Sequence, residues 1–460
     1  MTDKPLLKKL KKYGKSHIAM HMPGHKRNTQ ILKNGLPYGI DITEIDGFDN
    51  LHDMAGVLKE TADFASSLYG SVCAFPLVNG STCGILAGIS ALSKKGDHIL
   101  VGRNCHKSVY NAIELFELFP HYVFPKTEKC GISGNITPES VEKALENCPE
   151  ISLVVITSPT YEGVLSDIEK IYDVCKSHNT ALLIDSAHGA HFGISENAFS
   201  QKIVPYCDIA VMSLHKTLPS LTQTALLHIC SSKVSKEKVN NALSVFETSS
   251  PSYVLLSSID ECLRFVSENK HFLSCLDKNL KFFYERCKKL KYLDVFHFGD
   301  LSKIIISTDK TDITGSDLSA LLRKHKIEVE MAQGNYCLAM ATIGDTKRSL
   351  NKLLSSLIKI DKNLNFSHNN TKIPNISEVH VIEKPFDAKE KDGVLMDFKN
   401  ALNSESLEYV WSYPPGIPII CPGERITPEM VEKINKMKSM GVEIKSTKGF
   451  KENKIYVSKN

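Results

Sequence analysis

The feature that most constrains this chain is an alternation of short aliphatic runs with longer helical stretches between about residue 60 and residue 230. Such alternation is typical of a mostly parallel β-sheet wrapped by helices, because parallel strands are joined by helical crossovers. The runs contain few polar residues, which predicts strands buried on both faces. We therefore expect an α/β fold with these strands: Phe75–Val78, His98–Val101, Leu153–Thr157, Ala181–Ile184 and Ile209–Met212.

Polar segments follow most of these expected strands directly. In open sheets of this kind, ligands bind beyond the carboxyl ends of the strands. The segments place hydroxyl, imidazole, amine and carboxylate groups at that edge: Asn79–Thr82, Ser158–Tyr161, Asp185–His188 and Ser213–Lys216. The carboxyl edge of the sheet is therefore the candidate site.

The length of 460 residues predicts more than one domain, since single hydrophobic cores stop growing at about 250–300 residues. Strand-like Lys303–Ser307 and Cys337–Thr342 indicate a smaller α/β unit, and the Asn-rich stretch 361–374 indicates a linker. We expect an N-terminal arm over 1–55, a large sheet domain over 56–295, a small α/β domain over 296–361 and a C-terminal α/β domain over 375–460.

The charge and cysteine patterns exclude several classes of protein. The formal net charge is +4 and the lysines are scattered, so nucleic-acid and membrane partners are not expected. No apolar segment follows the N-terminal lysines, and no stretch approaches the roughly 18 apolar residues of a spanning helix, which predicts a cytoplasmic protein. The 13 cysteines include no Cys-x-x-Cys pair, so neither a disulfide scaffold nor a structural zinc site is expected, and we predict no metal.

A lysine and a carboxylate occupy the predicted ligand edge. Lys216 closes the segment after one expected strand, and Asp185 comes directly after the preceding strand. A lysine at a strand end is ordinarily solvated. However, enzymes that use pyridoxal 5′-phosphate (PLP) need a lysine to form an imine and a carboxylate that keeps the pyridine nitrogen protonated. The pair therefore suggests PLP chemistry.

Two further segments suit such a cofactor. Asn79–Thr82 follows a strand and opens a helix expected from Thr82 to about Leu92, whose free N–H groups favour a phosphate. An ordinary helix N-cap is the alternative interpretation. His106 follows the next strand and can stack on a planar ring, although a histidine in a loop is often structural.

Taken together, these residues resemble the Orn/Lys/Arg decarboxylase family, PLP enzymes of the aspartate-aminotransferase-like fold type I. The resemblance is to the compact bacterial members and implies a large, mostly parallel cofactor domain with smaller C-terminal α/β domains. It is carried by segments along nearly the whole chain: His21–Arg27, Asp41–Asp53, Asn79–Thr82, Cys105–Ser108, Ser158–Gly163, Asp185–Phe192, Ser213–Gln223, Thr248–Tyr253 and Tyr413–Glu424.

The resemblance implies a role for each matching residue. Lys216 would be the Schiff-base lysine, Asp185 the partner of the pyridine nitrogen, and His106 the stacking residue. His188 would lie beside the cofactor, and both His188 and the freed Lys216 are candidate proton donors at Cα. The phosphate would be held by Ser81, Thr82, Ser213 and His215.

The segment that contains Thr248 and Ser249 resembles one that reaches the cofactor site of the neighbouring subunit. The resemblance therefore implies at least a homodimer with shared active sites. Ser186 is a departure, because many members of the family carry a glutamate at that position. This difference leaves substrate preference and full activity open.

The implied reaction is decarboxylation of a basic L-amino acid to a polyamine-precursor amine and carbon dioxide. Arginine, lysine and ornithine are the candidate substrates, and the run 213–219 favours arginine because it resembles the compact arginine-type members. Two alternatives stay open: another PLP-dependent lyase or aminotransferase reaction, and a weakly catalytic PLP-fold protein with a binding or regulatory role.

The cationic end of such a substrate needs a negative partner once it leaves water. The acidic stretch 41–53 or Glu424 is a candidate for this role, and a solvated loop is the other interpretation of the acidic stretch. The spacing of its carboxylates does not match a calcium-binding EF-hand loop.

Overall fold

The computed structural model describes residues 18–20, 49–367, 374, 376–413, 416–448 and 453–459. Most of the predicted N-terminal arm lies outside these described residues, as do the segment 21–27 and the acidic residues Asp41, Glu44 and Asp46. Residues 368–373 of the expected linker and Pro414 and Pro415 of the C-terminal turn cluster also lie outside them.

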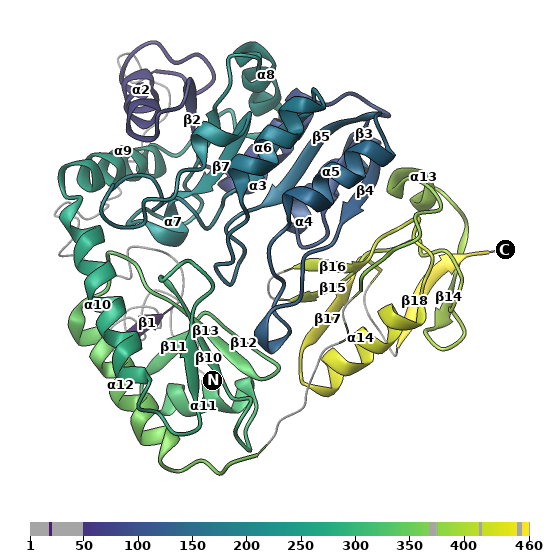
Figure 1. Ribbon diagram of the computed structural model, residues 1–460. Helices are drawn as coiled ribbons and strands as arrows, with labels where there is room; N and C mark the ends of the chain where they lie inside the picture. The colour runs from purple at the N-terminus through teal and green to yellow at the C-terminus, as the bar shows by residue number, and fades with distance from the viewer. Residues whose placement is uncertain are drawn as a thin grey trace, which may run out of the picture.

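The centre of the molecule is a seven-stranded sheet with the order β2-β8-β7-β6-β5-β3-β4 (Figure 1). β8 runs antiparallel to both of its neighbours, and every other adjacent pair is parallel. The strands are β2 (Cys73–Leu77), β3 (His98–Gly102), β4 (Phe119–Val123), β5 (Ile151–Thr157), β6 (Ala181–Asp185), β7 (Ile209–Ser213) and β8 (Ala225–Ile229). The mostly parallel α/β fold predicted from the sequence is therefore confirmed.

All five strands expected in this sheet are present, with small shifts at their ends, and two further strands were missed. β4 lies at the edge of the sheet, where Pro120 needs no outer hydrogen-bond partner, and its burial alternates. Its mixed sequence therefore lacks the continuous apolar run of a central strand. β8 is fully buried but contains His228, which interrupts the aliphatic pattern.

Helices cover both faces of the sheet and create two cores. α3 (Gly80–Leu92), α4 (Lys107–Leu115) and α8 (Lys236–Phe246) pack on one face. The other face is covered by α2 (Val57–Tyr69), α5 (Pro138–Asn147), α6 (Ile168–Ser177) and α9 (Tyr253–Glu268). Successive residues of one strand enter different cores, as Leu182 and Leu183 of β6 do. This two-sided burial explains why the central strands are almost wholly apolar.

Two smaller units flank the sheet. The first has an antiparallel sheet of order β12-β13-β10-β9, which includes both strands expected there: β9 (Asp294–Phe296), β10 (Lys303–Ser307), β12 (Met331–Gln333) and β13 (Tyr336–Met340). Three helices belong to it: α10 (His271–Cys287), α11 (Gly315–Lys324) and α12 (Lys347–Asp361). β1 (Ile18–Met20) pairs in parallel with β11 (Ile327–Val329).

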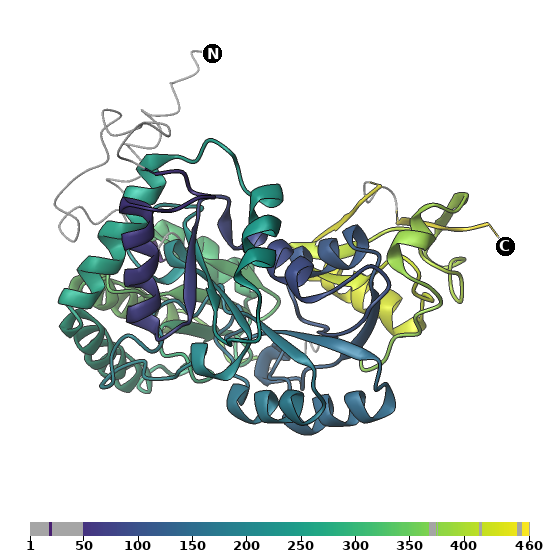
Figure 2. The same ribbon diagram turned by 90° about the horizontal axis from the view of Figure 1, so that it is seen from above.

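The C-terminal unit lies beside the β3–β4 end of the central sheet (Figure 1, Figure 2). It contains the pair β14 (Gly393–Asp397) and β18 (Lys454–Ser458), and a sheet of order β16-β15-β17. The remaining elements are β15 (Val410–Tyr413), β16 (Ile417–Ile420), β17 (Glu443–Ser446), α13 (Pro385–Lys389) and α14 (Pro428–Ser439). A buried ion pair between Arg103 and Glu424 ties this unit to the end of β3.

No helix among the described residues combines the length and apolar character needed to cross a membrane.

Candidate active site

A cavity of about 560 Å³ lies at the carboxyl ends of the central strands. It is closed on one side by residues of the two smaller units, including Glu330 and Tyr413. The predicted site residues that line it are Ser81, Thr82, His106, Asp185, His188, His215 and Lys216. The structure thus brings together side chains from the segments after β2, β3, β6 and β7.

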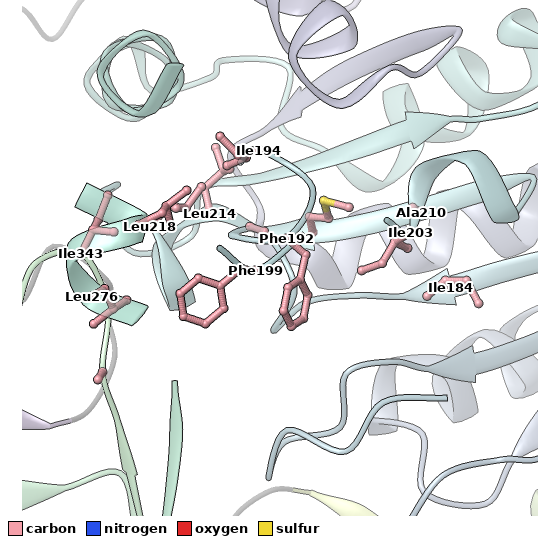
Figure 3. Packing of buried hydrophobic residues seen from close by; sticks show 14 of the residues in the cluster. Ile184, Phe192, Ile194, Phe199, Ile203, Ala210, Leu214, Leu218, Leu276 and Ile343 are labelled. Carbon is pink, nitrogen blue, oxygen red and sulfur yellow. The ribbon is translucent and has the colours of Figure 1, made fainter. Parts of the chain in front are cut away.

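Lys216 lies in the short helix α7 (Leu214–Thr217), which follows β7 directly. Leu214 and Leu218 are fully buried on either side of it, in the core that Figure 3 shows. This packing fixes the backbone while the amine reaches the cavity. Burial lowers the pKa of Lys216, and the nearby carboxylates of Asp185 and Glu330 oppose that shift. Burial thus acts toward the neutral form of the amine, which is the nucleophilic form.

Asp185 is the last residue of β6 and is only 3% exposed. One of its oxygens accepts a hydrogen bond from the backbone N–H of Ala187 at 3.1 Å. Burial raises the pKa of this carboxyl group, while the Lys216 charge and that N–H group act in the opposite direction. A carboxylate so placed gains from a cationic partner in the cavity.

His188 contacts two lysines, one at each ring nitrogen. Its Nε2 lies 3.2 Å from Nζ of Lys216, and its Nδ1 lies 2.8 Å from Nζ of Lys303. Burial lowers the pKa of His188 well below its usual range, and the two lysine charges add to this effect, so the ring is neutral. A neutral imidazole has one donor and one acceptor nitrogen, whereas an ammonium group only donates. Only one of the two lysines can therefore be an ammonium in these contacts.

Lys303 lies among buried charged groups. This first residue of β10 is fully buried, and its charge interacts with the buried carboxyl groups of Asp300 and Glu162. Gly163, at φ +87°, lies so close to the Lys303 side chain that an added Cβ would stand 2.6 Å from its Cγ. If Lys303 is the ammonium of the two lysines, it donates to Nδ1 of His188, and the ring proton then lies on Nε2, facing the Lys216 amine.

His106 presents its ring to the cavity from the N-terminus of α4. Its Nδ1 accepts a hydrogen bond from the backbone N–H of Ser108 at 3.2 Å. Burial lowers the pKa of His106 to about 4, with the charges of Lys216 and Lys107 adding to the effect. The ring is therefore neutral near pH 7, as suits a group that stacks on another aromatic ring.

The opposite wall of the cavity suits a phosphate. Gly80 has φ +76° and begins α3; its own N–H donates to the carbonyl of Gln223 at 2.8 Å, and the next N–H groups have no acceptor within the helix. Ser81 and Thr82 follow at the same turn and line the cavity. Ser213 does not line the cavity; it is fully buried, and its Oγ has no hydrogen-bond partner among the described residues. Free amides and hydroxyls of this kind fit the phosphate of PLP.

Sequence reasoning did not assign Tyr161, Glu162 and Glu330, which also line the cavity. Tyr161 donates a hydrogen bond to Glu330 at 2.6 Å, and Tyr336 donates one to Glu162 at 3.1 Å. Burial raises the pKa of Glu162. Neither Glu330 nor Lys303 gave a signal in the sequence, because Glu330 stands alone between two short strands and a lysine that opens a strand, as Lys303 does, is ordinarily solvated.

Glu424, suggested from the sequence as a partner for the substrate cation, has a different role. Both of its oxygens accept hydrogen bonds from Arg103, at 2.6 and 2.8 Å, and it does not line the cavity. Thr248 and Ser249 also lie outside the cavity lining of their own chain. The backbone N–H of Thr248 donates to Asn79 at 3.4 Å, so the segment lies beside the turn that begins α3.

Comparisons with known proteins identify relatives of this chain in sequence and in fold. The chain is 31% identical to the arginine decarboxylase of Bacillus anthracis, over 96% of this chain and 94% of that protein. It is 30% identical to the arginine decarboxylase of Bacillus subtilis, over 96% of this chain and 95% of that protein. The lysine decarboxylase of Francisella novicida has the same fold, with a TM-score of 0.77 at 20% identity over 98% of this chain and 80% of that one.

The fold-type-I architecture expected from the resemblance is therefore confirmed. Residues 4–298 match the major domain of the Orn/Lys/Arg decarboxylases, a match that covers more than half of the chain. The sequence identities to the two arginine decarboxylases extend the agreement through the C-terminal unit. The chain belongs to the Orn/Lys/Arg decarboxylase family.

Proposed function

We propose that this chain is a PLP-dependent decarboxylase of a basic L-amino acid, with arginine as the favoured substrate. The observation that carries the proposal is the meeting of the Lys216 amine and the buried Asp185 carboxylate in one cavity lined by acidic groups. Family membership and the two related arginine decarboxylases support the reaction and the choice of substrate.

Different residues of the site would bind the phosphate, the ring and the pyridine nitrogen of the cofactor. The N-terminus of α3, with Ser81 and Thr82, would hold the phosphate together with Ser213 and His215. His106 would stack on the ring, and Asp185 would keep the pyridine nitrogen protonated. PLP, when bound, supplies an electron sink for the pair that is released as carbon dioxide leaves.

The contacts of His188 with the two lysines determine which of its ring nitrogens carries the proton. With Lys303 donating to Nδ1, the Nε2–H group of His188 donates to the free electron pair of Lys216 and keeps that amine neutral and oriented. A neutral amine attacks the cofactor, and an ammonium does not. His188 would also be a candidate proton donor for the step after carbon dioxide leaves, because its Nε2 faces the Lys216 amine. Lys303 therefore acts as a positioning residue through His188.

We assign Glu330 as the partner of the distal cation of the substrate. It lines the cavity, it is held by Tyr161, and its charge reaches Lys216. A guanidinium or ammonium removed from water requires such a carboxylate.

We further propose a cytoplasmic homodimer in which Thr248 and Ser249 of each subunit complete the site of the other.

An absorbance spectrum and a product assay test the function. The purified protein should show the visible absorbance of lysine-bound PLP. It should release carbon dioxide and the matching amine from arginine, lysine or ornithine without a keto acid. Amino-group transfer to a keto acid, or the absence of turnover with all three substrates in protein loaded with PLP, would contradict the proposal.

A further inference from the structure

Three potential metal ligands converge at the amino edge of the central sheet, away from the cavity. His98 is the first residue of β3, His121 lies in the neighbouring strand β4, and Cys148 caps α5 just before β5. The backbone pairings of β3 with β4 and with β5 hold these three segments side by side. The three residues do not touch the proposed active site.

The distances between the ligand atoms match a metal site. Nδ1 of His98 and Nε2 of His121 are 2.9 Å apart, and Sγ of Cys148 lies 3.8 and 3.6 Å from these two nitrogens. A tetrahedral zinc ion with ordinary bond lengths places two such nitrogens about 3.3 Å apart and each nitrogen about 3.6 Å from the sulfur. Hydrogen bonds among the three groups fit the same distances, because the thiol lies within hydrogen-bond distance of both nitrogens, so metal binding has to be measured to separate the two arrangements.

The surroundings of His98 provide a nearby carboxylate and a path from solvent. The other ring nitrogen of His98 lies 3.8 Å from a carboxylate oxygen of Glu150. Histidines that bind metals commonly donate the proton of their second nitrogen to a carboxylate; here the 3.8 Å separation is longer than a hydrogen bond, and the Glu150 side chain is 76% exposed. The side chain of His98 is 31% exposed, which gives an ion a path from solvent.

We propose that His98, His121 and Cys148 form a binding site for one zinc ion or a similar borderline-soft divalent cation. The set of two imidazoles and one thiolate suits zinc, and a water molecule completes four ligands. A bound ion would join β3, β4 and the α5–β5 turn at one end of the sheet. We therefore infer a structural role that stabilises the sheet and leaves the chemistry of the cavity unchanged.

This proposal departs from the expectation drawn from the cysteine pattern. The ligands are separated by 23 and 27 residues and come from three different elements. A search for closely spaced cysteine pairs cannot find such a set. Only the pairing of the strands brings the ligands together.

Cobalt titration of the full chain, loaded with PLP and stripped of metal by a chelator, tests the site. Wild-type protein should bind about one equivalent of Co²⁺ with the absorption of a thiolate-bound tetrahedral ion, and Zn²⁺ should displace it. Cys148→Ser should lose this absorption and bind Co²⁺ at least about 100-fold more weakly, while Glu150→Gln should weaken binding by about 10-fold. Cys275→Ser and His271→Gln, at exposed positions, are the matched controls and should bind as the wild type does.

Amine release should be the same in wild-type and Cys148→Ser protein, which separates this proposal from the proposed function. In the wild type itself, Zn²⁺ should protect Cys148, but not Cys275, from alkylation. This measurement needs no variant to fold. Absence of cobalt binding by the wild type, equal binding by Cys148→Ser, or alkylation of Cys148 that Zn²⁺ does not slow would overturn the proposal and leave a hydrogen-bonded histidine pair only.

Discussion

The two edges of the central sheet differ in how their side chains are assembled. At the carboxyl edge, short segments at the ends of the strands supply the cavity, as Asp185, His215 and Lys216 show. At the amino edge, the ligand cluster of His98, His121 and Cys148 comes from single residues on separate elements. A site built from segments can be found in a sequence, whereas a site built from single residues requires the fold.

The two edges also differ in the state of their charged groups. At the carboxyl edge, burial raises the pKa of Asp185 and lowers that of Lys216. Shifted pKa values of this kind are typical of functional sites. The three residues of the amino-edge cluster are only partly buried, and their ligand atoms all lie within 4.8 Å of one another. Substitutions at the carboxyl edge should therefore change turnover, while those at the amino edge should change metal binding and stability.

The largest effect should follow from Lys216→Ala. We expect loss of the visible absorbance of lysine-bound PLP and a decrease in kcat of at least about 1,000-fold, because Lys216 is the one lysine among the described residues that line the cavity. Steady-state amine release and a spectrum of the dialysed protein measure this. Multiple turnover at a rate near that of the wild type would remove Lys216 from the chemistry.

Asp185→Asn should lower kcat by about 100-fold or more while the fold and much of the cofactor are retained. A neutral amide has the shape of the carboxylate but cannot stabilise a protonated pyridine nitrogen. The visible spectrum serves as the control for cofactor content. Near-native kcat in the loaded variant would show that another group is the partner of the ring nitrogen.

Lys303→Met should lower kcat by about 10- to 100-fold, because His188 loses the donor that fixes its proton on Nε2. The ¹⁵N chemical shifts of the His188 ring report the tautomer directly, and a loss of stability alone would not move them toward the other form. Lys310→Met, at an exposed lysine of the same unit, is the matched control. An unchanged His188 tautomer would refute the positioning role.

Glu330→Gln should have the smallest effect on the maximal rate and a selective effect on recognition. We expect kcat/KM for arginine to fall by about 10- to 100-fold, because a buried cation loses its partner, and the preference for arginine over citrulline to shrink similarly. Glu328→Gln, which removes a carboxylate outside the cavity, is the control. An unchanged preference would mean that another acidic residue pairs with the substrate.

Much of the fold was predictable because the central strands are buried on both faces and therefore read as unbroken aliphatic runs. The edge strand β4 was missed, since it carries Pro120 and His121 and alternates between buried and partly exposed residues. The predicted limits of the four domains stay a proposal. The N-terminal arm lies mostly outside the described residues.

The candidate site was predictable where its residues belong to segments after strands, and seven of the predicted residues line one cavity. Lys303 and Glu330 were not assigned, because they come from the smaller unit and only the packing of that unit against the sheet brings them there. The roles of Thr248 and Ser249 in a neighbouring subunit stay a prediction. Glu424 was suggested by its charge alone, and its pairing with Arg103 depends on a contact between units.

Borohydride reduction of the wild-type protein loaded with PLP tests the central claim most directly. Reduction fixes the cofactor on the lysine that holds it, and peptide mass spectrometry then identifies that lysine. We predict that the label lies on the peptide that contains Lys216, and that Lys303, on the other side of His188, carries none. Labelling of Lys303 or of any other lysine in place of Lys216 would contradict the account.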